Sequence, residues 1–134
     1  MTDEKKFEVH AEITVRLTKQ DVDDIMVSAL EGGICYWCDR VTVEGQYLGK
    51  YASEQISRGG TLKVHVPEPF DEQDTEWYEL DIEKFIQGFR LWLENGGDCY
   101  GAVSGDGKVD CGEIDAGCAD AIIQYALFGE VVYG

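Results

Sequence analysis

The stretch from Ala102 to Glu113 has the residue types and the spacing to hold a hard cation. Side-chain oxygens stand at its third, fifth, ninth and twelfth positions, and a main-chain carbonyl would serve at the seventh. These ligands are Ser104, Asp106, Asp110 and Glu113, with Lys108 supplying the carbonyl. Gly107 occupies the sixth position, where such a loop turns sharply. Calcium prefers oxygen ligands of this kind, so calcium is the cofactor that this stretch suggests.

The first position of this stretch departs from the pattern, because Ala102 has no side-chain oxygen. Asp98 lies near enough in the chain to replace it, although the spacing does not require it. A second interpretation needs no ion: residues 105–107 form a tight turn and Asp110 caps the following helix. In the calcium interpretation Val109, at the eighth position, is expected to tie the loop to the core.

The run Ser-Gly-Asp-Gly-Lys-Val-Asp at 104–110, followed by a helix over 114–128, resembles one calcium-binding half of a dockerin repeat, an EF-hand-type loop. The resemblance covers about thirty residues. Dockerins carry two such loops and this chain shows one, so the resemblance implies a calcium-stabilised interaction module and assigns no cellulosomal role.

The chain is strongly acidic, with 27 Asp and Glu against 11 Lys and Arg and a formal net charge of −16. Such a surface repels nucleic acid and anionic membranes and attracts basic partners. Solubility alone would account for a smaller excess. The acidic residues are dense in the segment 67–76, which we expect to be too polar to pack. Its candidate partner-binding residues are Glu68, Asp71, Glu72, Asp74 and Glu76.

No catalytic motif is visible in the sequence. No serine has the setting of a nucleophile elbow, and His10 and His65 both fall in strand-like runs without a metal-hydrolase motif. The sequence therefore predicts a protein that acts by binding rather than by catalysis.

Five cysteines in a chain without a signal-peptide pattern indicate reduced thiols and a cytoplasmic location. Cys35 and Cys38 form a C-x-x-C pair, and Cys99, Cys111 and Cys118 could add thiolate ligands for zinc. The pair lies in an apolar, strand-like run, where residues three apart point to opposite faces. Buried, unreactive thiols are therefore the favoured interpretation.

Hydrophobic periodicity predicts one α+β domain over residues 1–134, an antiparallel sheet of about four to five strands with three helices packed mainly on one face. The expected strands are 7–17, 34–43, 61–66 and 77–80, with 131–133 as a closing strand. The expected helices are 18–31, 81–94 and 114–128, with a short helix at 52–56. Strands 61–66 and 77–80 should form a hairpin with the acidic segment at its tip.

The run Leu17 to Val43, with Ala29-Leu-Glu-Gly-Gly-Ile and Tyr36-Trp37, resembles uncharacterised small acidic proteins of phages and mobile elements in Gram-positive bacteria. This resemblance implies an inhibitor of the anti-CRISPR or anti-restriction type, a DNA mimic that binds a basic, nucleic-acid-binding host protein. It implies no direct contact with nucleic acid or membrane. The alternative is the calcium-stabilised module, and the sequence predicts neither the partner's identity nor the oligomeric state.

Overall fold

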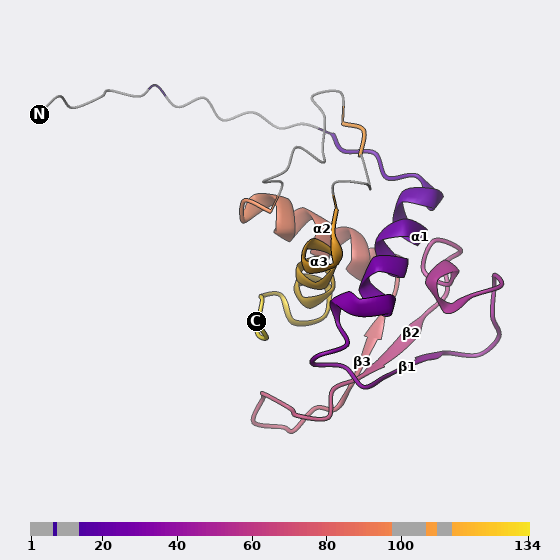
Figure 1. Ribbon diagram of the computed structural model, residues 1–134, viewed down its shortest axis with the longest axis vertical. Coiled ribbons are helices and arrows are strands. Elements are labelled where there is room, and N and C mark those ends of the chain that lie inside the picture. The colour runs from indigo at the N-terminus through magenta and orange to yellow at the C-terminus, as the bar shows by residue number, and fades with distance from the viewer. Residues whose placement is uncertain (1–6, 8–13, 98–106, 110–113) are drawn as a thin grey trace, which may run out of the picture.

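The computed structural model describes residues 7, 14–97, 107–109 and 114–134 (Figure 1). It shows an α+β arrangement of three α-helices and a three-stranded antiparallel sheet, which confirms the fold class predicted from the sequence. The elements in chain order are α1 (Lys19–Ser28), the π-helical turn η1 (Ala29–Gly33), β1 (Arg40–Val43), the 3-10 turn η2 (Ala52–Glu54), β2 (Leu62–His65), β3 (Trp77–Leu80), α2 (Ile82–Glu94) and α3 (Ala116–Phe128).

The sheet has the order β1-β2-β3, and β2 and β3 form the predicted hairpin with the acidic segment at its tip. Arg40, His65 and Trp77 lie side by side across the three strands in one row of the register. Because side chains alternate along a strand, this row points away from the core, and the row containing Val64 points into it. The three helices gather on one side of the sheet (Figure 1).

Among the described residues the sheet has three strands, and the larger sheet expected from the sequence is not confirmed. The predicted strand 7–17 falls largely on residues outside the described part, and its described end, 14–17, has no regular structure. The predicted closing strand 131–133 is also irregular. The predicted strand 34–43 is wrong over its first six residues, because only Arg40–Val43 is extended in the sheet.

The apolar run 34–38 follows a helical stretch that ends at Gly33, in the pair Gly32-Gly33. α1 widens into η1, and the Ile34 amide donates to the Ala29 carbonyl. The chain then turns back and buries Trp37 in the core. An apolar run of this length is equally compatible with a buried strand, so its composition could not distinguish the two.

The helix termini are set by local signals that the sequence displays. Thr18 and Asp21 form the reciprocal capping box of α1, and Asp81 caps α2 through the Lys84 amide. The cap of α3 was predicted wrongly: Asp115, not Asp110, accepts the Cys118 amide. Gly129 ends α3 as predicted, in the left-handed conformation.

One hydrophobic core joins the helices and the inner face of the sheet. Its largest fully buried side chains include Phe85 of α2, Ile25 and Met26 of α1, and Ile122 of α3. α2 and α3 pack tightly at Gly88, where a Cβ atom would lie 2.5 Å from the Ile122 carbonyl oxygen. In the described part of the chain, no helix is both long and apolar enough to span a membrane.

Candidate binding surface

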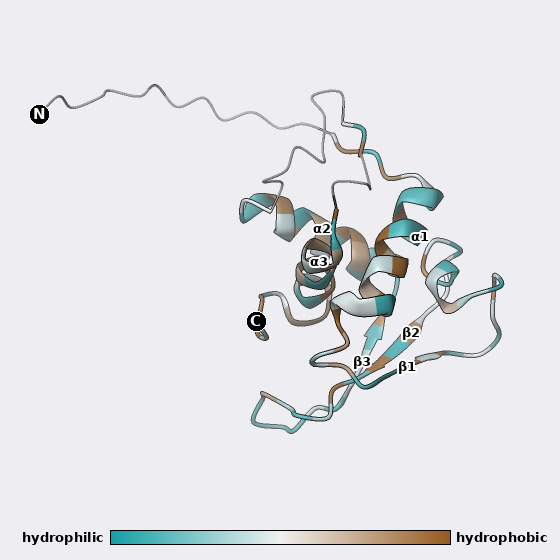
Figure 2. Ribbon diagram, viewed as in Figure 1, coloured by the Kyte–Doolittle hydropathy of each residue, from teal (hydrophilic) through white to brown (hydrophobic). Residues whose placement is uncertain are grey.

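The acidic loop, residues 67–76, is held in place by its own side chains. The Phe70 ring packs edge-on against Phe128 at a centroid distance of 5.0 Å. The Asp71 carboxylate accepts the Thr75 amide at 2.7 Å, and the Val66 amide donates to the Glu76 carbonyl at the base of the loop. The expectation that this segment is too polar to pack is therefore wrong, because one aromatic residue anchors an otherwise hydrophilic loop (Figure 2).

The five predicted partner-binding carboxylates fall into two groups. Asp71 and Glu76 have internal roles, since Asp71 binds Thr75 and Glu76 binds His65. Glu68, Glu72 and Asp74 are exposed. Asp74 adopts a positive φ of 53°, a conformation that aspartate and asparagine tolerate better than most residues. The loop therefore presents four exposed carboxylates, because Glu76 is also 55% exposed beside His65.

His65 lies between two carboxylates at the base of the acidic loop. Its Nδ1 is 2.5 Å from Asp39 Oδ1, and its Nε2 is 3.2 Å from Glu76 Oε1. The side chain is 13% exposed and packs against the Trp77 ring. The hydrogen bond to Asp39 raises the pKa of His65, and the same bond lowers the pKa of Asp39. Protonated His65, at the end of β2, thus connects the start of β1 with the start of β3.

The outer face of the sheet is polar and uncovered. The Arg40 guanidinium lies over the Trp77 ring, 5.0 Å from its centroid. A shallow depression beside it is lined by Thr42, Lys63, Trp77 and Glu79. The sequence analysis missed this face and the His65 cluster. The register of the three strands would have predicted them, because it places every second residue of β1, β2 and β3 in the same row.

A buried carboxylate, Asp120 of α3, is surrounded by neutral donors. It accepts hydrogen bonds from Trp37 Nε1 at 2.6 Å, from the Tyr36 hydroxyl at 2.6 Å and from Gln124 Nε2 at 2.9 Å. Burial, together with the bond to Asp120, raises the pKa of Tyr36 to about 12. These contacts join α3 to the turn that follows η1.

The candidate calcium loop is described only in part. Ser104, Asp106, Asp110 and Glu113 lie outside the described residues, and Lys108 is exposed. Gly107 has a left-handed φ of 83°, and its carbonyl accepts the Arg16 amide at 2.8 Å. Val109 packs against the core, as its place in the pattern predicts. The described residues hold no group of three or more metal-binding side chains.

The described cysteines do not form a shared site. Cys35 is exposed, Cys38 is buried and Cys118 is half-buried, while Cys99 and Cys111 lie outside the described residues. Burial raises the pKa of the Cys38 thiol, which makes it less reactive.

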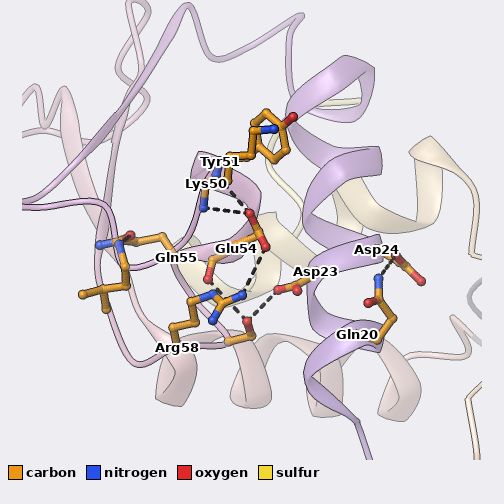
Figure 3. Close-up of polar contacts among 10 residues, drawn as sticks. Gln20, Asp23, Asp24, Lys50, Tyr51, Glu54, Gln55 and Arg58 are labelled. Atoms are coloured by element: carbon orange, nitrogen blue, oxygen red, sulfur yellow. Dashed lines mark hydrogen bonds and ion pairs between the residues drawn. The ribbon is translucent and has the colours of Figure 1, made fainter.

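A second ordered loop lies at the opposite end of the sheet, over residues 44–61 (Figure 3). The buried Gln55 accepts the Leu48 amide, and Glu54 accepts the amides of Lys50 and Tyr51. A bond from Ser57 to Asp23 joins the loop to α1. The sequence analysis expected a short helix at 52–56, and the structure has η2 there.

Comparison with known proteins gives no relative: no family model, curated protein or solved structure matches the chain.

Proposed function

We propose that this protein acts by binding, and that its acidic loop engages a basic surface on a partner protein. The observation that carries the proposal is the combination of net charge and an ordered acidic loop. Residues 67–76 contain five carboxylates and no Lys or Arg. Fixing the loop before association reduces the entropy lost on binding, which favours an interface function.

The partner class that we propose is a nucleic-acid-binding protein of the host. A surface that binds phosphates is basic, and a carboxylate-rich loop offers it negative charge without nucleic acid. This is the DNA mimicry of an anti-CRISPR or anti-restriction inhibitor, in a phage or mobile-element protein. Catalysis has no part in this proposal.

A matched pair of variants tests the proposal. Glu72→Gln with Asp74→Asn removes two charges from the loop and keeps its backbone, because asparagine also tolerates the positive φ at position 74. Glu44→Gln with Glu83→Gln removes two exposed charges beyond the other end of the sheet. Each protein is immobilised, exposed to a host lysate, and its bound proteins are identified by mass spectrometry.

We expect the unmodified protein and the Glu44/Glu83 variant to retain the same basic protein, and the Glu72/Asp74 variant to lose it. Retention by all three proteins would contradict a role for the acidic loop. Equal loss from both variants would show that net charge, rather than the loop, determines binding.

A calcium-stabilised interaction module is the second candidate function. Two features of the described part of the loop favour it: the left-handed conformation of Gly107 and the packing of Val109 on the core. The test is a thermal melt of metal-stripped protein with and without millimolar calcium, since an ion that binds only the folded state raises the midpoint. We expect a rise that Asp106→Ala and Glu113→Ala abolish. An unchanged midpoint would make residues 102–113 a turn without an ion.

A further inference from the structure

The segment 131–133 satisfies its backbone through one side chain instead of a strand. Gln124 Oε1 accepts the amides of Val132 and Tyr133, each at 2.8 Å. Gln124 Nε2 donates to the Tyr133 carbonyl at 2.9 Å. One amide side chain therefore binds three main-chain groups of two successive residues, which is the kind of contact that an extended peptide makes with a receptor.

The binding amide is held in one orientation by a network behind it. Gln124 is completely buried, and its Nε2 also donates to Asp120 Oδ1, the same carboxylate oxygen that accepts the Trp37 Nε1 hydrogen bond. The Tyr36 hydroxyl lies within reach of both Asp120 and the Tyr133 carbonyl, at 2.6 Å and 3.0 Å. The polar part of the site is thus built from residues of α3 and the turn after α1, not from the segment that it holds.

The Tyr133 side chain occupies an aromatic site beside this amide. Its ring stacks on Trp37 at 5.6 Å with an angle of 5° between the planes, and Phe128 and Phe70 contact it edge-on. Its hydroxyl donates to the Glu68 carbonyl at 2.8 Å. The aromatic residues select a ring, and the Glu68 carbonyl selects tyrosine over phenylalanine.

We propose that Gln124 and these aromatic side chains form a peptide-binding site, which residues 131–133 of the same chain occupy as an exchangeable segment. Its ligand class is an extended peptide in which a tyrosine follows an apolar residue. The segment has no regular structure, and Val131 is 46% exposed. Segments of this kind open at a lower free energy than the core.

One consequence rests on the proposed function. Tyr133 contacts the acidic loop twice, through the Phe70 ring and the Glu68 carbonyl. Opening of the segment would therefore remove an anchor of the loop and weaken binding of the basic partner, and a bound tyrosine peptide would restore that anchor. This consequence fails if the acidic loop is not the interface, whereas the peptide site is tested independently of the loop.

The test uses a dye-labelled peptide with the sequence of residues 129–134 and the full chain carrying Tyr133→Ala, which empties the aromatic site. We expect saturable binding, measured by fluorescence anisotropy, with one peptide per chain. The unmodified chain should bind the peptide at least about tenfold more weakly, because its own segment competes. A peptide with alanine in place of tyrosine is the control and should not bind.

Absence of peptide binding to a folded Tyr133→Ala chain would overturn the proposal. If that variant does not fold, hydrogen exchange of the unmodified chain tests whether residues 131–133 are an exchangeable segment. Exchange of the Val132 and Tyr133 amides at a lower free energy than the amide of Ile123 would support an exchangeable segment, and exchange of all three only on global unfolding would overturn it. Sedimentation of the unmodified chain identifies which molecule supplies the natural peptide. A dimer that Tyr133→Ala abolishes indicates a second copy of this chain, and a monomer that binds the peptide indicates another protein.

Discussion

At the scale of single residues, His65 links the strands of the sheet through two carboxylates. It connects Asp39, just before β1, with Glu76, just before β3, and it lies next to Arg40 and Trp77 in the register. The end of β2 and the start of β3 also form the base of the acidic loop. The protonation state of one imidazole therefore affects the surface that we propose as the interface.

The His65 cluster predicts a pH dependence of stability. The folded-state pKa of His65 is raised above its ordinary value of 6.5, so the protonated form stabilises the fold. That contribution is fully present below pH 6.5 and is lost as the pH rises through the raised pKa. Urea unfolding of the unmodified chain should show stability that decreases as the pH rises above 6.5, and His65→Gln should flatten this decrease. Equal slopes for the two proteins would contradict the assignment.

Asp120 gives a second prediction at this scale. Asp120→Asn keeps the shape of the side chain but removes the charge that Trp37, Tyr36 and Gln124 donate to. Loss of charge-assisted bonds at a buried site should destabilise the protein by about 2–3 kcal/mol. Chemical denaturation measures this loss. Asp24→Asn, on the exposed side of α1, is the control and should cost about 0.5 kcal/mol or less.

At the scale of elements, the contact between α2 and α3 depends on Gly88. A Cβ atom there would lie 2.5 Å from the Ile122 carbonyl oxygen and 2.6 Å from the Ala126 Cβ atom, so the helices must separate. Alanine favours helix formation, but overpacking two helices costs more than this gain. Gly88→Ala should therefore destabilise the protein by about 1–3 kcal/mol in thermal or urea unfolding.

Gly32→Ala is the matched control for Gly88→Ala, because a Cβ atom at Gly32 meets nothing within 4 Å. We expect it to leave stability unchanged or slightly raised. A Gly88→Ala variant as stable as Gly32→Ala would show that the two helices do not pack as closely as described.

Some elements could be predicted from the sequence and others could not. The difference depends on how far apart in the sequence the contacting residues lie. Thr18 and Asp81 cap helices through bonds to residues three positions away, so α1 and α2 were predicted from local pattern. Trp37 owes its position to Asp120, 83 residues away, and no local pattern distinguishes its turn from a strand. Segment 131–133 had strand-like composition, but Gln124 supplies the partner that a strand would have supplied.

The candidate site, too, could be predicted only where its features depend on residues close in the sequence. The acidic segment 67–76 is visible as a run of residue types, and its place at a hairpin tip follows from the strands beside it. The roles within it were not predictable, because Asp71 and Glu76 are assigned by contacts to Thr75 and His65. The anchoring of Phe70 depends on Phe128, which is distant in the sequence.

At the scale of the whole molecule, the net charge of −16 acts on every encounter. Long-range attraction speeds association with a basic partner, and added salt screens it. Contacts through apolar groups depend much less on ionic strength. The salt dependence of affinity therefore distinguishes binding through the acidic loop from binding through another surface.

The most direct test of the central claim is the affinity of the captured partner at a series of salt concentrations, measured with the unmodified chain and both charge variants. We predict that the dissociation constant of the unmodified chain rises steeply with salt. The Glu72/Asp74 variant should bind more weakly with a shallower slope, and the Glu44/Glu83 variant should stay close to the unmodified chain. An affinity that does not change with salt, or equal slopes for the two variants, would contradict the account.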